Sequence, residues 1–243
     1  MKNGKEIKEI VKNKYKEIAV KNSGCGCGCS KNISKSIGYS EKEIEEGGDA
    51  NLGLGCGNPV AMSKIKSGDT VLDLGCGAGF DCFLAAKKVG RTGKVIGVDM
   101  TEEMIKKAKV NAKSLGIKNT EFILGEIENL PIKDGSVDII ITNCVVNLTP
   151  DKAKTFREAY RVLKNDGKIY LSDIVLLKEL SKEQKNDDNL LAGCVAGALL
   201  KEDYLKKIKN AGFDARILSE NKEISKEQYN GIALESLMVE AVK

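Results

Sequence analysis

Between residues 70 and 175, the apolar positions follow two alternating patterns: short continuous runs and longer stretches at helical spacing. Continuous runs of this length predict buried strands. They are TVLDL (70–74), KVIGVD (94–99), EFILGE (121–126), VDIIIT (137–142) and GKIYLSDIV (167–175). FDCFLAAKKV and two later stretches each carry one apolar stripe, which predicts amphipathic helices. Strands that alternate with helices predict a parallel sheet covered on both faces.

The segments on either side of this core show weaker patterns. Residues 4–21 place apolar side chains at helical spacing, which predicts an amphipathic helix. After residue 177 the alternation pauses in an insertion that is helical in parts, and KEDYLKKIKNAGF then predicts a helix ending at Gly212. ARILSE and ALESLMVEAV predict a terminal pair of strands.

Together these elements predict an α/β fold. We expect a doubly wound, Rossmann-like, seven-stranded and mostly parallel sheet with a terminal antiparallel strand pair. An N-terminal helical and loop extension and an insertion after the fifth strand complete it. The expected regions are 1–64, 65–177 and 178–243. Thr149 is expected to cap the helix after the fourth strand, with Pro150 in its first position.

Composition narrows the class of protein. The chain has 243 residues and a net charge of +4, spread along its length, with 5% aromatic residues and no Trp. A nucleic-acid groove needs a basic face and stacking rings, so we expect no nucleic-acid partner. The apolar runs are too short to cross a membrane, and the basic N-terminus lacks an apolar signal region. We therefore expect a cytoplasmic protein without a membrane partner, whose thiols are kept reduced.

Cysteine and histidine usage is unusual. The chain has eight cysteines and no histidine. A mixed Cys/His zinc site is therefore excluded, as are Ser-His-Asp and Cys-His catalysis, which both need an imidazole base. C-x-x-C spacing is also absent, so neither a zinc ribbon nor a thioredoxin-type motif is present. The thiols must act through sulfur alone.

A glycine loop follows the first predicted strand. VLDLGCGAGF places Gly75, Gly77 and Gly79 between strand and helix, with Asp73 two residues before the first glycine. An acid there would repel a pyrophosphate but suits a cationic ligand, and Asp99 at the end of the second strand suits a ribose diol. S-adenosylmethionine has a ribose, a positive charge and no phosphate. An ordinary strand–turn–helix is the alternative, and the two acids with the three glycines argue against it.

With these motifs, the chain resembles class I S-adenosylmethionine-dependent methyltransferases over roughly residues 65–240. The resemblance implies that Asp73 and the three glycines line the methionine side and that Asp99 binds the ribose. It further implies contacts to the adenine from Met100, Gly125, Glu126 and Ile127, and a place for Asn143 facing the sulfonium. Members that act on a base or amide nitrogen carry an N-P-P-Y type motif where this chain has NCVV, so such substrates are not expected.

Three cysteines are expected at one edge of the sheet. Cys144 follows the fourth strand, Cys56 lies in the turn-like GLGCGNP before the first, and Cys194 lies in the insertion after the fifth. Ligands of open α/β sheets bind beyond the carboxyl ends of the strands, so these thiols could converge beside the cofactor. Three thiolates make a soft site. Trivalent arsenic fits it, because its lone pair can attack a methyl sulfonium without a general base.

YRVLKNDGKIYLSDI, NCVVNLTPDK, GCVAGALL and GCGNP together resemble arsenite methyltransferases. The resemblance implies methyl transfer from S-adenosylmethionine to arsenite or its thiol adducts, with Cys56, Cys144 and Cys194 as arsenic ligands and Cys82 in disulfide exchange. It also implies an external reductant of the thioredoxin or glutathione type. Region 1–64 would then cover the site, 65–177 would bind the cofactor and 178–243 would carry the arsenic-binding insertion. Nothing marks an interface, so we expect a monomer.

Several alternatives stay open. Cys76 is interpreted as packing. Cys25, Cys27 and Cys29 form a C-x-C-x-C loop that could capture arsenite, exchange disulfides with Cys56 or Cys82, or be an incidental flexible tail. The disulfide pairing is undetermined. A rival hypothesis is a methyltransferase for another small molecule, such as a quinone precursor or sterol, with structural cysteines. Another is a thiol-based sensor for soft metals.

Overall fold

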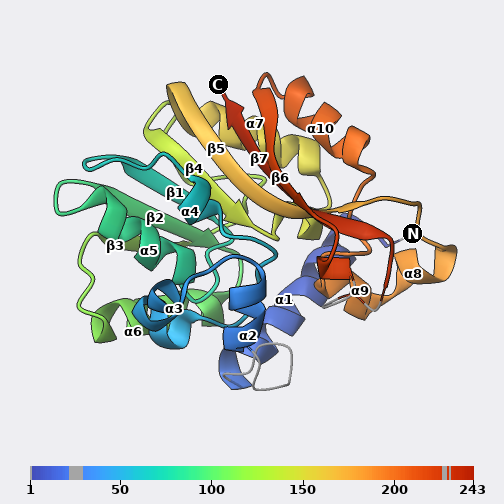
Figure 1. Cartoon of the computed structure of the whole chain (residues 1–243), viewed down its shortest axis with the longest axis horizontal. Coiled ribbons are helices and arrows are strands. Elements are labelled where there is room, and N and C mark those ends of the chain that lie inside the picture. Colours follow the sequence, from blue (N-terminus) through green and yellow to red (C-terminus); the bar gives the residue numbers. More distant parts are fainter. Residues whose placement is uncertain (1, 22–29, 226–228, 230) are drawn as a thin grey trace.

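The computed structural model describes residues 2–21, 30–225, 229 and 231–243, which build around a single seven-stranded sheet (Figure 1). Its strand order is β3-β2-β1-β4-β5-β7-β6. The strands are β1 (Thr70–Leu74), β2 (Lys94–Asp99), β3 (Thr120–Leu124), β4 (Val137–Asn143), β5 (Leu163–Leu176), β6 (Asp214–Asn221) and β7 (Leu234–Val242). The first five are parallel, and β7 runs antiparallel to both β5 and β6. The predicted sheet, including its terminal antiparallel pair, is confirmed.

Helices cover both faces of the sheet. α5 (Phe80–Val89) and α6 (Glu102–Ser114) pack on one face, and α7 (Lys152–Val162) and α10 (Lys201–Asn210) on the other. Successive side chains of a strand point to opposite faces, and β1 accordingly sends Val71 into one core and Leu72 and Leu74 into the other. Both faces of the central strands are thus apolar, as their continuous hydrophobic runs require.

The N-terminal segment lies over the carboxyl ends of the strands. It comprises α1 (Gly4–Lys21), α2 (Ser30–Ser36), α3 (Glu41–Gly47), the 3-10 helix η1 (Gly48–Ala50) and the short α4 (Pro59–Met62). The α1 helix confirms the amphipathic pattern of residues 4–21 and packs beside α6, where Lys16 pairs with Glu103 at 2.9 Å. Ser40 and Glu43 form a capping box that begins α3.

The insertion after β5 is helical in parts, as predicted, with α8 (Lys182–Asn186) and α9 (Asp188–Ala192). α9 packs against α1 from the opposite end of the chain, as Figure 1 shows. Within the described residues, no helix has the length and apolar character that crossing a membrane requires.

The start of α7 differs from the prediction. The 3-10 helix η2 (Val146–Leu148) follows β4, and the Thr149 hydroxyl turns back to donate to the carbonyl oxygen of Val146 at 2.8 Å. Thr149 therefore does not cap α7. Asp151 does, because its carboxylate accepts from the N–H of Lys154 at 2.9 Å, and Pro150 lies just before this cap.

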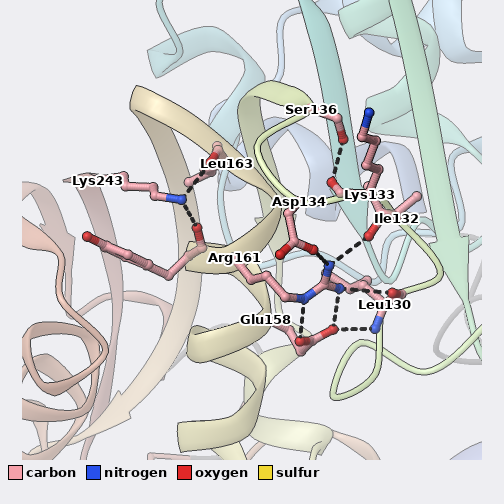
Figure 2. Close-up of polar contacts among 10 residues, drawn as sticks. Leu130, Ile132, Lys133, Asp134, Ser136, Glu158, Arg161, Leu163 and Lys243 are labelled. Carbon is pink, nitrogen blue, oxygen red and sulfur yellow. Dashed lines mark hydrogen bonds and ion pairs between the residues drawn. The ribbon is translucent and has the colours of Figure 1, made fainter.

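Arg161, in the last turn of α7, ties this helix to the loop that follows β3 (Figure 2). Its guanidinium donates to the carbonyl oxygens of Leu130 and Ile132 at 3.0 and 2.9 Å. It also pairs with Glu158 at 2.7 Å and with Asp134 at 2.5 Å. The planar fork of an arginine can serve several acceptors at once, which a lysine cannot do. One side chain therefore holds a loop whose first residues are those predicted to contact adenine.

Replacing Arg161 with Lys should lower the free energy of unfolding by about 1–3 kcal/mol, because the carbonyl oxygens of the loop lose their donors. Urea denaturation measures this change. Arg157→Lys is the matched control, since Arg157 is exposed on the same helix. Equal stability of the two variants would contradict the anchoring role.

Candidate active site

A cavity opens at the carboxyl ends of β1, β2 and β4, under the N-terminal segment. Most of the residues predicted to bind the cofactor line it, namely Asp73, Gly75, Gly77, Asp99, Met100, Gly125, Ile127 and Asn143, together with Cys144. Gly79 and Glu126 lie outside this lining. Glu126 instead accepts from the Lys8 ammonium at 2.7 Å, while Glu128, which also pairs with Lys8 at 3.2 Å, lines the cavity.

The glycine loop turns tightly where β1 ends. Gly75 has a φ of 71°, and a Cβ added there would lie 2.6 Å from a methyl group of Val145, so only glycine fits. The Gly77 N–H donates to one carboxylate oxygen of Asp99 at 3.0 Å, and the Thr101 N–H donates to the other at 2.8 Å. The Thr101 side chain also hydrogen-bonds to this carboxylate. A carboxylate can accept about four hydrogen bonds, so Asp99 can still accept one from a ribose diol.

Three carboxylates face this cavity without a basic partner. Asp73, Asp81 and Asp99 have only 3%, 8% and 8% of their surface exposed. Burial raises the pKa of all three carboxyls, to about 6 for Asp81, and the charge of Asp81 further raises the pKa of Asp73. Across the described ranges, no lysine or arginine forms an ion pair with any of them. Because buried charges are costly unless paired, the cavity fits a cationic ligand such as S-adenosylmethionine.

Asn143 joins the cavity to the segment that carries Cys56. Its carboxamide oxygen accepts from the Cys56 N–H at 3.0 Å, and its nitrogen donates to the carbonyl oxygen of Gly57 at 2.8 Å. The same nitrogen lies 2.9 Å from the Tyr39 hydroxyl and 3.2 Å from a carboxylate oxygen of Asp81. Tyr39 and Asp81 are cavity residues that the sequence reasoning missed. A second acid so close to the glycine loop was the available signal for Asp81.

The three cysteines predicted to converge do lie together. Cys56 and Cys144 are joined by a disulfide with 5.9 Å between their Cα atoms, a pairing the sequence left open. The Cys194 thiol donates to the carbonyl oxygen of Cys144 at 2.9 Å. All three residues are buried. Cys144 and Cys194 have φ values of 57° and 67°, a left-handed backbone that is uncommon for residues other than glycine and often marks functional sites.

The glycines on either side of Cys56 allow its backbone to pack closely against the sheet. A Cβ on Gly55 would lie 2.6 Å from the amide nitrogen of Asn143, and a Cβ on Gly57 would collide with the hydroxyl of Ser172. The Cys56 sulfur lies 3.6 Å from that hydroxyl. The G-C-G sequence therefore lets the backbone press closely against β4 and β5.

A polar cluster lies beneath the cysteines. The Cys56 and Cys144 sulfurs and a carboxylate oxygen of Asp173 all lie within 4.8 Å of one another. Asp173 accepts from the Asn147 amide at 2.8 Å and from the Tyr204 hydroxyl at 3.0 Å, and burial raises its pKa to about 6. Burial lowers the pKa of the neighbouring Lys152 to about 8.

The other cysteines have different surroundings. Cys82 is fully buried, and its thiol donates to a carboxylate oxygen of Asp73 at 3.2 Å. Burial raises the pKa of Cys82 well above its usual value, and that of Cys76 to about 11. Disulfide exchange by Cys82 stays a prediction. Cys25, Cys27 and Cys29 lie outside the residues that the structure describes, so their predicted roles also stay predictions.

Residues 65–212 match the family described as "Methyltransferase domain". The fold and this match place the chain in the methyltransferase domain family. An arsenite methyltransferase of Halobacterium salinarum is 44% identical over 86% of this chain and 58% of its own length. The crystal structure of an arsenic(III) S-adenosylmethionine methyltransferase from Chlamydomonas reinhardtii is 33% identical, with a TM-score of 0.68 over 87% of this chain and 73% of that one. The chain belongs to the arsenite methyltransferase family.

Two other findings show how far the similarity to known methyltransferases extends. The chain spans little more than half the length of the Halobacterium relative, 58%. A demethylmenaquinone methyltransferase of Lactococcus lactis is 39% identical, but over only 42% of this chain. The similarity to arsenite methyltransferases thus extends well beyond the portion shared with the quinone-pathway enzyme.

The stability of the protein should depend on pH through Asp173. Its native pKa of about 6 lies above the usual 3.8, so between these values the folded state holds a proton that the unfolded state has lost. The contribution of Asp173 to stability is then highest below this window and falls as the pH rises through it, by about 3 kcal/mol. Asp173→Asn should remove this part of the slope in urea denaturation at pH 4 to 7.

Asp203→Asn is the control, because Asp203 is exposed on α10. Its pH profile should follow the wild type. If the profile of Asp173→Asn also runs parallel to the wild type, Asp173 does not titrate in this window.

Proposed function

We propose that this protein transfers methyl groups from S-adenosylmethionine to trivalent arsenic held by Cys56, Cys144 and Cys194. One observation carries the proposal: three cysteines from three distant segments are buried together beside a cavity lined by the buried carboxylates of Asp73, Asp81 and Asp99. Cys144 belongs to both features, since it lines the cavity and touches the other two cysteines.

When bound, S-adenosylmethionine would supply a methyl group activated on a sulfonium. In this proposal Asp73 receives the amino group of the methionine moiety, and Asp99 receives the ribose hydroxyls through its remaining lone pairs. The adenine would lie against Met100, Gly125 and Ile127. Glu126 was predicted to contact the adenine amino group, and release of its bond to Lys8 would free it for that role.

The arsenic chemistry begins with reduction. An external thiol of the thioredoxin or glutathione type gives two electrons and two protons to the Cys56–Cys144 disulfide, which yields two thiols. Arsenite or a thiol adduct then exchanges its three ligands for the three cysteine sulfurs, and the cysteine protons leave with the displaced groups. No general base is needed at arsenic itself, because it has a lone pair and no proton to lose.

Methyl transfer follows from this arrangement. The arsenic lone pair attacks the methyl carbon, the carbon–sulfur bond of the donor breaks, and S-adenosylhomocysteine leaves. Arsenic is then pentavalent. Two cysteine thiolates return it to the trivalent state by giving two electrons and forming a disulfide, and the external thiol resets them. The bonded pair Cys56 and Cys144 is compatible with the state after this step.

The three predicted regions take roles within this proposal. Residues 1–64 cover the site, 65–177 bind the cofactor, and 178–243 bring Cys194 to the arsenic. We place the activity in the cytoplasm, where a thiol reductant is available, and in a monomer. Action on a quinone precursor is less well supported, since the relative of that kind aligns with 42% of the chain against 86% for the arsenite enzyme.

The direct test is to incubate the reduced protein with arsenite, labelled S-adenosylmethionine and thioredoxin, and to measure label on arsenic. Cys144→Ser and Cys194→Ser should each lower the rate at least about 100-fold, because a hydroxyl is a hard ligand that binds trivalent arsenic poorly. Asp203→Asn is the control and should retain activity within a few-fold, since Asp203 is exposed on α10 and does not line the cavity.

Two outcomes would count against the proposal. Wild-type protein that puts no label on arsenic would overturn the activity. Full activity in Cys194→Ser would overturn the three-sulfur site while leaving the methyl transfer itself in place.

A further inference from the structure

Tyr39, Asp81 and Asn143 form one hydrogen-bonded group in the wall of the cavity. The Tyr39 hydroxyl donates to one carboxylate oxygen of Asp81 at 2.6 Å, and the Asn143 amide lies 3.2 Å from the other. The three residues come from the segment before α3, the first turn of α5 and the end of β4. The Tyr39 ring also packs on Phe80, with 4.9 Å between ring centroids. A carboxylate is therefore held rigidly at the cavity wall.

These hydrogen bonds leave the Asp81 carboxylate with unused acceptor sites. The two hydrogens of the Asn143 amide nitrogen face three oxygens, those of Gly57, Tyr39 and Asp81, at 2.8, 2.9 and 3.2 Å. Asp81 is the most distant of the three. A carboxylate can accept about four hydrogen bonds or ion contacts, so Asp81 has capacity left for a ligand.

The charges around Asp81 are negative. Asp73 on β1 and Glu43 on α3 both act on it electrostatically. Within the described part of the chain, Asp81 forms no ion pair. A buried anion among other anions is unfavourable until a cation arrives. The feature that needs explaining is thus a second acid, beyond Asp73, at the end of the cavity next to Asn143 and Cys144.

We propose that Asp81, held by Tyr39 and Asn143, is a specificity residue that binds the positive sulfonium of S-adenosylmethionine in preference to the neutral thioether of S-adenosylhomocysteine. This inference rests on the proposed function for the identity of the cofactor. The donor carries the charge before methyl transfer, and the product has lost it afterwards. The same carboxylate therefore favours substrate binding and, by losing its partner, favours release of the product.

The group also connects the cofactor to the arsenic site. Asn143 accepts from the N–H of Cys56, so the carboxamide that orients Asp81 also positions a proposed arsenic ligand. A cation beside Asp81 favours the ionised form of that carboxyl, which is the form that accepts from Tyr39 and Asn143.

The test measures two dissociation constants by calorimetry on the reduced protein without arsenite. In Asp81→Asn the affinity for S-adenosylmethionine should fall roughly tenfold to a hundredfold, the range for loss of one charged hydrogen-bonding partner. The affinity for S-adenosylhomocysteine should change less than about threefold. Tyr39→Phe keeps the charge and should preserve most of the preference for the sulfonium. Asp203→Asn on α10 is the control and should bind both ligands like the wild type.

If Asp81 had only a structural role, Asp81→Asn would lower the affinity for both ligands equally, and that result would overturn the proposal. Should Asp81→Asn fail to fold, the wild type still tests the proposal. It should prefer S-adenosylmethionine, and sinefungin with an amine in place of the sulfonium, over S-adenosylhomocysteine, and equal affinities would overturn it. Wild-type protein that binds none of these would instead overturn the cofactor assignment itself.

Discussion

The site depends on the carboxamide of Asn143. It stands at the last position of β4, paired with Ser172 of β5, and it binds both the N–H of Cys56 and the carbonyl oxygen of Gly57. The loop that carries Cys56 precedes the first strand in the sequence. These hydrogen bonds fasten it to the end of β4, which lies in the middle of the sheet. Because strand side chains alternate between faces, a shift of one residue in β4 would turn Asn143 away and place Cys144 in its position. The register of one strand thus decides where both the cavity wall and the Cys56–Cys144 pair lie.

The cavity carries an electrostatic cost that its ligand would offset. Parallel strands end together at one edge, so acids placed after neighbouring strands must lie near one another. Asp73, Asp81 and Asp99 are buried there without basic partners among the described residues, which raises their pKa values. Such an arrangement is unfavourable in the empty protein and becomes favourable when a cation binds. In the proposed function, the stability lost in the ligand-free state would be offset when the positively charged donor binds.

Much of the fold could be predicted because its signals are local. The β1 and β2 boundaries follow from apolar runs closed by glycine or acid, and the loop from Gly75 onward follows from its glycines. The beginning of α7 could not be predicted, because Thr149 and Asp151 are both good caps and only the intervening η2 turn decides between them. The local sequence allows either residue to cap α7, and the tertiary structure determines that Asp151 does so.

The candidate site shows the same division. Topology alone brought Cys144 and Cys194 to one rim, since strand ends and crossover segments share it. No pattern could show that Tyr39 would reach Asp81, because the N-terminal segment reads as a series of short, mixed elements with no indication of where it docks. The disulfide between Cys56 and Cys144 was equally beyond reach, since cysteine pairing is not deducible from spacing.

The left-handed backbone of Cys144 and Cys194 lowers the stability of the protein at two residues that the proposed chemistry needs. Each of these residues costs about 1 to 2 kcal/mol relative to a relaxed conformation, a cost that glycine would not bear. Glycine would relieve this strain at either position, but it would also remove a buried sulfur and, at Cys144, the disulfide to Cys56, which contributes about 2–4 kcal/mol. Substitutions meant to stabilise the protein are therefore better placed away from these two positions.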